Sequence, residues 1–138
     1  LSIRRQRQMC IRDRDLERLA VGDSLHMHLR TELEANNVLY ASHAKCIYDF
    51  NRESSVHSKI KNAPNTSKAR YITEDVPYLF VPFCELADLC GVDVPIAKAL
   101  VTIASYYNDE DYMKTGRTLA KMGFNHWTKQ EILAFLES

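Results

Sequence analysis

Residues 76–107 read VPYLFVPFCELADLCGVDVPIAKALVTIASYY, and they set the fold class. Pro77 lies where a helix begins, because the first turn of a helix tolerates a residue without an amide proton. Apolar residues then recur at helical spacing until Gly91, which is typical of the left-handed residue that ends a helix. Pro95 begins a second helix over residues 96–107, which is apolar on nearly all sides. We therefore predict two packed helices, the second one buried at the centre of a helical domain.

The rest of the chain also shows helical patterns. Apolar residues at helical spacing predict further helices over residues 15–29, 32–48, 54–60, 111–122 and 128–136. Thr128-Lys129-Gln130-Glu131 is a capping box, in which the threonine and glutamate side chains bind each other's backbone amides at a helix start. Residues 61–69 gather Asn, Pro, Thr and Ser and are predicted to form a loop. Because strand patterns are almost absent, the sequence predicts an all-α helical bundle.

Between that loop and residue 76 lies Arg70-Tyr71-Ile72-Thr73-Glu74-Asp75, which sets one fixed cation beside two carboxylates. An arginine presents a planar fork that suits a carboxylate, so it is a natural anchor for an organic acid. A buried aspartate can hold a catalytic histidine in one tautomer and stabilise its protonated form. Arg70 and Asp75 could therefore form half of a proton-transfer site. The simpler interpretation is that Arg70 pairs with Glu74, four residues on, and that Asp75 caps the next helix.

Several blocks of this sequence resemble one family. The blocks are DLERLAV at 15–21, RYITEDVPY at 70–78 followed by Leu79 to Pro82, GVDVP at 91–95 and GRTL at 116–119. In order and spacing they resemble the C-terminal domain of the octopine/nopaline (opine) dehydrogenases, from about Asp15 to the C-terminus. Family members usually carry glycine after the Pro-Tyr pair, where this chain has Leu79, so we expect the local turn to differ.

The resemblance implies a helical bundle of the 6-phosphogluconate dehydrogenase C-terminal type, which serves as the substrate domain of an NAD- or NADP-dependent opine dehydrogenase. Such an enzyme condenses an amino acid with a 2-oxo acid such as pyruvate, and NAD(P)H reduces the resulting imine. By resemblance, Arg70 is expected to bind the oxo-acid carboxylate and Asp75 to orient the catalytic histidine. Tyr71 and Glu74 are expected to support that site. The histidine itself is expected in a segment N-terminal to this domain, outside the chain.

The sequence contains no glycine-rich dinucleotide or phosphate loop, so we expect the cofactor to bind mainly to a separate N-terminal Rossmann domain. By itself the chain is then expected to be inactive, with small-molecule substrates and that missing domain as its partners.

The rival hypothesis is a non-catalytic helical module that binds another protein. An enzyme domain brings Arg70 and Asp75 to one cleft, whereas an interaction module leaves them on separate faces. A third hypothesis keeps the dehydrogenase but changes the substrate to a simple 2-hydroxy acid. No residue distinguishes NADH from NADPH, or one amino acid from another.

Composition divides the chain into two parts. Of the 138 residues, 46% are hydrophobic, which is enough for a compact core. The net charge is zero, but residues 1–14 contain five Arg and one Asp and carry +4, so residues 15–138 carry −4. Residues 1–14 resemble the translated read-through of a sequencing adapter, and we expect an artefact that is disordered or non-native. The domain then comprises residues 15–138, without a basic surface for nucleic acid.

No run reaches the roughly 18 apolar residues of a membrane span, so we expect a cytoplasmic domain.

Other residues that could carry chemistry have simpler explanations. The cysteines show no paired spacing and are predicted to be free buried thiols in a reducing compartment. They are Cys10, Cys46, Cys84 and Cys90. His26 and His28 lie two residues apart, so on a helix they point about 200° from each other, and no metal site is expected. Arg117 is expected to pair with Asp111 or Glu110.

Overall fold

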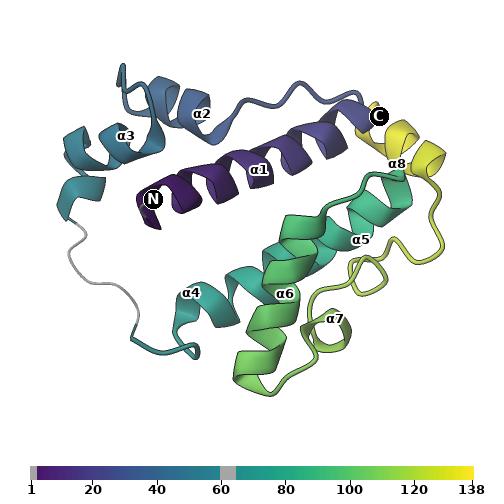
Figure 1. Ribbon diagram of the computed structural model, residues 1–138. Coiled ribbons are helices and arrows are strands. Elements are labelled where there is room, and N and C mark those ends of the chain that lie inside the picture. Colours follow the sequence, from purple (N-terminus) through teal and green to yellow (C-terminus); the bar gives the residue numbers. More distant parts are fainter. Residues whose placement is uncertain (1–2, 60–64) are drawn as a thin grey trace.

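The computed structural model describes residues 3–59 and 65–138, and every regular element in them is helical (Figure 1). The elements are α1 (Ile3–Ser24), α2 (Glu32–Leu39), α3 (Ile47–Glu53), η1 (His57–Lys59), α4 (Arg70–Thr73), η2 (Val76–Phe80), α5 (Val81–Cys90), α6 (Pro95–Asn108), α7 (Tyr112–Thr115) and α8 (Lys129–Leu136). The predicted all-α class is confirmed. The specific likeness to the 6-phosphogluconate dehydrogenase bundle stays a prediction.

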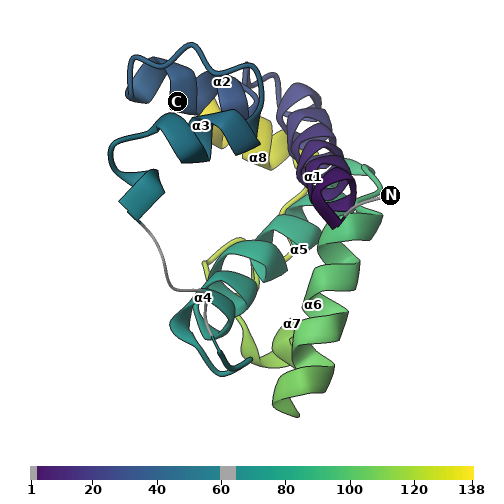
Figure 2. The ribbon, with the colours of Figure 1, turned by 60° about the vertical axis from the view of Figure 1, so that its left-hand side comes forward.

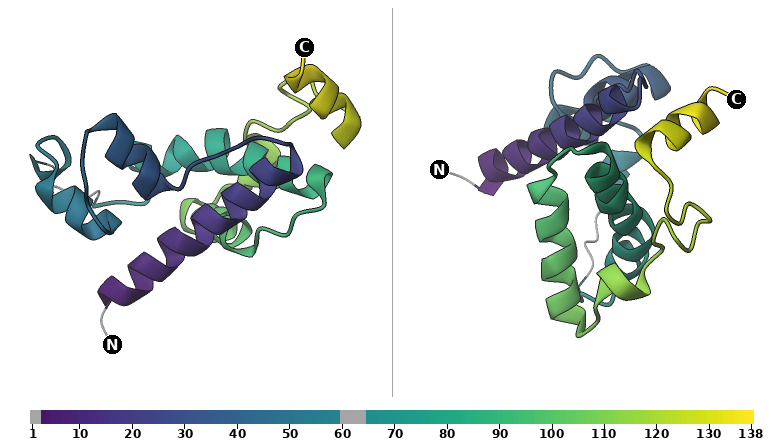
Figure 3. Two further views of the ribbon diagram at one scale, coloured as in Figure 1. Left: turned by 90° about the horizontal axis from the view of Figure 1, so that it is seen from above. Right: turned by 90° about the vertical axis from the view of Figure 1, so that its right-hand side faces the viewer.

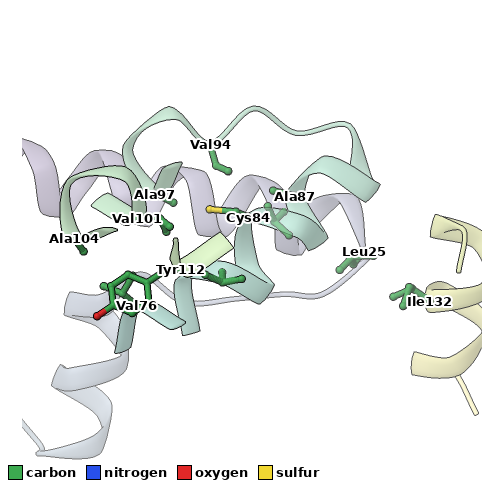
Figure 4. Close-up of a cluster of buried hydrophobic side chains, with 12 residues drawn as sticks. Leu25, Val76, Cys84, Ala87, Val94, Ala97, Val101, Ala104, Tyr112 and Ile132 are labelled. Carbon is green, nitrogen blue, oxygen red and sulfur yellow. The ribbon is translucent and has the colours of Figure 1, made fainter. Parts of the chain in front are cut away.

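The core forms where α1 crosses the pair of helices α5 and α6 (Figures 1 and 2). From α5 come Cys84 and Ala87, and from α6 come Ala97 and Val101, all of them buried. Figure 4 shows these side chains together with Val94, which lies in the connection between the two helices. Val81 of α5 and Ala104 of α6 also belong to the core, and the rest of the chain adds Val21, Leu25, Val76, Tyr112 and Ile132. Since many of these side chains are small, the helices can approach one another closely while removing apolar surface from water.

Two carboxylates of α1 hold the starts of other helices. The Glu17 carboxylate accepts hydrogen bonds from the backbone N–H groups of Ile96, at 2.6 Å, and Ala97, at 3.0 Å, in the first turn of α6. The Asp15 carboxylate accepts one from the backbone N–H of Glu32, at 2.9 Å, in the first turn of α2. The start of a helix has unpaired N–H groups and the positive end of the helix dipole, so a carboxylate there is stabilising. Helix α1 therefore fixes where α2 and α6 begin.

Residues 70–90 follow a nearly continuous helical path through α4, η2 and α5 (Figures 1 and 3). Within this path η2 is a π-helix, because the N–H of Val81 bonds the carbonyl of Val76, five residues back. In a π-helix the Pro77 carbonyl would pair with the N–H of residue 82, but that residue is also a proline. The wide turn therefore leaves the Pro77 carbonyl available to another part of the chain.

Three local predictions are confirmed. Gly91 ends α5 with φ of 71°, and its N–H bonds carbonyls in the last turn of that helix. Pro95 is the first residue of α6. Thr128 and Glu131 form the reciprocal capping box at the start of α8, with the Thr128 N–H bonded to the Glu131 carboxylate at 2.6 Å. Each of these signals acts within one helical turn, so neighbouring residues are enough to determine it.

The prediction that the second helix is buried at the centre of the domain holds for one face of α6 only. Ala97, Val101 and Ala104 lie on the buried face of α6, as a core helix requires. Leu100 and Ile103 lie on its other face, where 40% and 53% of their surface is exposed. Apolar composition all round a helix therefore does not mean burial all round in this chain.

The predicted bounds of the other helices also need correction. Residues 32–48 do not form one helix, because α2 ends at Leu39 and Ala41 adopts a left-handed φ of 49° before α3 begins. Within residues 54–59 the helix predicted at 54–60 is reduced to the single 3-10 turn of η1, and residue 60 lies outside the described residues. The helix predicted at 111–122 stops at Thr115, and residues 116–122 form turns. Of the predicted loop, residues 65–69 are non-helical and 61–64 lie outside the described residues.

The first helix differs from its prediction at both ends. It begins at Ile3 rather than near Asp15, and it ends at Ser24 rather than near Leu29. Its end coincides with a turn in which His26 has a left-handed φ of 58°. The helical path thus crosses residue 14 without a break. The origin of residues 1–14, and a domain that comprises residues 15–138, stay predictions.

Candidate functional site

The structure joins Arg70 to Glu74. The Arg70 Nε lies 3.0 Å from a Glu74 carboxylate oxygen, with one residue on the first turn of α4 and the other just beyond its end. Both side chains face water, since 83% of the Arg70 side chain and 56% of the Glu74 side chain are exposed. This is the pair that the simpler interpretation expected. Its exposure makes it weak, because water screens both charges.

Tyr71 and Asp75 lie on the next strip of the same helical path. They are four residues apart, so they occupy neighbouring turns of one face. Both are exposed, with 62% of Tyr71 accessible to water. Arg70 and Asp75 are five residues apart, which places their side chains about 140° apart around a regular helix. The structure therefore keeps all four candidate residues on one short exposed segment, but it joins only Arg70 and Glu74 by contact.

The π-helix after Asp75 is held by residues far along the chain. The backbone N–H of Arg117 donates to the free Pro77 carbonyl at 2.8 Å. Gly116 makes this approach possible, because an added Cβ would lie 2.9 Å from that same carbonyl oxygen. The block Gly116-Arg117 is thus explained by backbone contact with η2. The suggested pairing of the Arg117 side chain with Asp111 or Glu110 is not seen among the described residues: Asp111 pairs with Lys114 at 2.6 Å, and Glu110 accepts a hydrogen bond from the Thr115 hydroxyl at 2.8 Å.

The turn after Gly116 is fixed by two further side chains that sequence reasoning missed. The Lys121 ammonium donates to the backbone carbonyls of Lys114, Thr115 and Gly116 at 3.1, 2.8 and 2.8 Å. A Glu85 carboxylate oxygen on α5 accepts from the backbone N–H of Leu119. The only signal in the sequence was a lysine shortly after a glycine, which is too common to interpret. The Lys121 contacts close the turn on itself, and the Glu85 contact keeps it against α5, which continues the helical path that begins at the candidate segment.

Asn108 at the end of α6 positions the residues just before α4. Its amide nitrogen donates to the Ser67 carbonyl and to the Tyr112 hydroxyl, both at 3.0 Å. Its buried Oδ1 has no hydrogen-bond partner among the described residues. Since Ser67 lies three residues before Arg70, this contact anchors the entry to the candidate segment.

The remaining candidates for chemistry have structural roles or none that the structure shows. Burial raises the pKa of the Cys84 thiol to about 11, which keeps the sulfur protonated and unreactive. Cys46, Cys84 and Cys90 form no disulfide. Across residues 3–59 and 65–138, no three His, Cys, Asp or Glu side chains gather as metal ligands would. None of the helices described is both long enough and apolar enough to cross a membrane.

The fold and the site define a class: an all-helical domain that presents charged residues on an exposed, π-interrupted helix. Residues 8–108 match the model of the family NAD/NADP octopine/nopaline dehydrogenase, alpha-helical domain, and the chain belongs to this family. The match confirms the resemblance seen in the sequence. It includes the blocks at 70–78 and 91–95 and ends before the block at 116–119.

Curated relatives agree with the family match. Protein ocs of Agrobacterium vitis is 33% identical over 108 residues, which is 78% of this chain and 30% of that protein. The vitopine synthase of Allorhizobium ampelinum is 30% identical over 112 residues, 81% of this chain and 31% of the synthase. The opine dehydrogenase of an Arthrobacter species is 28% identical over 123 residues, 89% of this chain and 34% of the enzyme. The chain thus spans about a third of the length of these relatives.

Proposed function

We propose that this chain is the substrate-binding helical domain of an NAD(P)-dependent opine dehydrogenase. In the proposed reaction the amine of an amino acid condenses with the carbonyl of a 2-oxo acid such as pyruvate, water leaves, and a hydride and a proton reduce the imine to a secondary amine. Membership of the octopine/nopaline dehydrogenase family is the observation that carries the proposal. A cytoplasmic location is part of the same proposal.

The described residues do not fit a bound dinucleotide. A pyrophosphate needs unpaired N–H groups at a helix start and a nearby glycine turn. The start of α6 is instead occupied by the Glu17 carboxylate, which would repel a phosphate. The starts of α2 and α8 are closed by the capping boxes of Thr31 and Thr128. We therefore assign the cofactor to a domain outside these residues and derive no step from it here.

For Arg70 we propose a role in binding the carboxylate of the oxo acid. Its guanidinium is accessible, and its contact with Glu74 is an exposed ion pair within one helix. Such a pair contributes at most about 1 kcal/mol, so an incoming carboxylate can replace it at little cost. A bidentate pair with a substrate held away from water is considerably stronger.

For Asp75 we propose that it orients a catalytic histidine supplied by the rest of the protein. It is exposed in this chain, which leaves its carboxylate accessible to a group from outside the helix. Once covered, an aspartate in contact with an imidazole fixes its tautomer and stabilises its protonated form. Tyr71, on the neighbouring turn, and Glu74 would then line the same surface.

A helical protein-interaction module remains the second candidate because one face of α6 favours it. Leu100, Ile103, Tyr106 and Tyr107 are all exposed on that helix, and the two tyrosine rings pack edge to face. A strip of this kind is typical of a surface that another domain or protein covers. In an opine dehydrogenase the same strip could be covered by the enzyme's own remaining domain.

The decisive experiment measures NAD(P)H oxidation by a protein that joins this domain to its dinucleotide-binding partner. Oxidation that needs both pyruvate and an amino acid is expected. No oxidation, even with both substrates present, would favour the interaction module. Arg70→Ala should raise KM for the oxo acid about tenfold to a hundredfold, because a charge-assisted pair is lost. Arg52→Ala, on α3, is the matched control. An unchanged KM in Arg70→Ala would remove this residue from the site. The isolated 138-residue chain should show no turnover.

A further inference from the structure

A cavity of about 370 Å³ lies between α1, α2 and the junction of η2 with α5. In Figure 2, α1 and α2 lie above α5, and α7 lies lower in the view. Its size falls within the range of small-molecule sites. None of the residues proposed above for the opine dehydrogenase reaction lines it. Its lining combines an apolar wall with a cationic rim, and both can be traced to particular side chains.

The apolar wall comes from successive turns of one helical path. Leu79 and Phe80 belong to η2, and Phe83 belongs to α5. Leu79 is 60% exposed, while the two phenylalanines are partly buried. Apolar surface left open in a cavity gains free energy when an apolar group covers it. The wall therefore favours a ligand with a hydrocarbon or aromatic body.

The rim carries one more positive than negative charge. Arg14 pairs with Glu32, and Arg18 pairs with Asp15 at 3.0 Å. Arg30 also lines the cavity, and its backbone carbonyl accepts a hydrogen bond from Arg18. Within the described part of the chain, the Arg30 guanidinium forms no ion pair. Among the residues that line the cavity, the Arg30 guanidinium is thus the one without an ion-pair partner, although the nearby Glu34 carboxylate also interacts with it electrostatically.

We propose that this cavity binds a monocarboxylic acid with an apolar body. The carboxylate pairs with Arg30, and the body packs against Leu79, Phe80 and Phe83. A second carboxylate would find no further unpaired guanidinium in the lining, so a dicarboxylate is disfavoured. This site is independent of the proposed reaction, although Leu79 lies only one helical turn after Asp75.

The test uses the complete 138-residue chain and two probes of nearly equal shape, 3-phenylpropionate and its neutral amide. Binding is followed by the backbone amide shifts of the ¹⁵N-labelled protein. The acid should shift the signals of Ala35, Asn36 and Leu79, and it should bind about tenfold more tightly than the amide because only the acid forms a charge-assisted pair.

Two variants and two controls locate the site. Arg30→Gln should bring the affinity for the acid down to that for the amide, without changing the latter. Leu79→Asp, at a position exposed enough to keep the fold, should weaken both probes. Arg52→Gln makes the same charge change on α3 and should have no effect, and Arg70→Gln should have none either.

The proposal is overturned by any of three results. They are the absence of shifts at the cavity, equal binding of acid and amide, and an acid affinity that depends on Arg70 rather than on Arg30. The last result would mean that the acid occupies the site proposed for the oxo acid. Loss of NAD(P)H oxidation in the joined protein would leave this proposal untouched, because neither probe needs turnover.

Discussion

Gly116→Ala should destabilise the protein through crowding rather than through backbone strain. Gly116 has an ordinary φ of −64°, which alanine adopts without cost. Its new Cβ, however, would lie 2.6 Å from the Tyr112 carbonyl oxygen, 2.9 Å from the Pro77 carbonyl oxygen and 3.0 Å from Val81 Cγ2. Two of these neighbours are backbone atoms, so the turn itself must move away from η2. That movement stretches the 2.8 Å hydrogen bond from the Arg117 N–H to Pro77.

The expected loss follows from these contacts. Overpacking costs about 1–3 kcal/mol, and the weakened hydrogen bond adds about 0.5–1.5 kcal/mol. Alanine also lowers the conformational entropy of the unfolded chain, which stabilises the folded state by about 0.4–1 kcal/mol and offsets part of this loss. The free energy of unfolding should therefore fall by about 2 kcal/mol. Urea unfolding followed by circular dichroism measures this as a lower midpoint with an unchanged slope.

Gly91→Ala is the matched control, because there an alanine would be strained by its backbone conformation and not by crowding of its Cβ. Gly91 has φ of 71°, and nothing lies within 4 Å of an added Cβ. Only the left-handed backbone conformation then disfavours alanine, and the free energy of unfolding should fall by about 1 kcal/mol. The amide signals of residues 76–80 should move in Gly116→Ala and stay in place in Gly91→Ala. A Gly116→Ala protein that is as stable as Gly91→Ala, with η2 undisturbed, would refute the packing argument.

Three other substitutions or treatments test the remaining structure. Glu17→Ala removes both acceptors at the start of α6 and should lower the free energy of unfolding by about 2–4 kcal/mol in urea, against almost no change for Glu137→Ala. Arg70→Ala should change that free energy by less than about 0.5 kcal/mol, because its ion pair is exposed. Cys84 should resist a thiol reagent in the native protein and react on unfolding. Because the pKa of Cys84 is raised from 9.0 to about 11, its contribution to stability is complete below pH 9 and is lost as the pH rises through 11. The measurement is the unfolding midpoint of the wild type and of Cys84→Ala as a function of pH. A wild-type midpoint that rises relative to that of Cys84→Ala between pH 9 and pH 11 would contradict the prediction.

Local signals in the sequence predicted the parts of the fold that depend on one helical turn. Gly91 and Pro95 mark the end of α5 and the start of α6, and the Thr128 capping box marks the start of α8. A glycine with positive φ, a proline without an amide proton and a reciprocal cap act through neighbours within four residues. Their effect does not depend on what the rest of the chain packs against them.

Contacts between distant residues account for what the sequence could not predict. Glu17 reaches an amide 79 residues away, and nothing in its own helix indicates this partner. The predicted helix at 111–122 fails because Gly116 must approach η2 and because Lys121 turns back onto three carbonyls. Helical propensity in residues 117–122 is then outweighed by tertiary contacts.

The candidate site shows the same limit more sharply. The sequence placed Arg70 and Asp75 in one segment, and the structure keeps them on one exposed helical path. Five residues on a regular helix correspond to a rotation of about 140°, so a small ligand that lies flat against one face of the helix is not expected to touch both side chains. A ligand that contacts both must approach from outside, along the exposed edge between them, and must be covered there by a second surface. On the proposed function, Arg70 and Asp75 would therefore form one wall of an active site, and catalysis would require a second domain that closes over them.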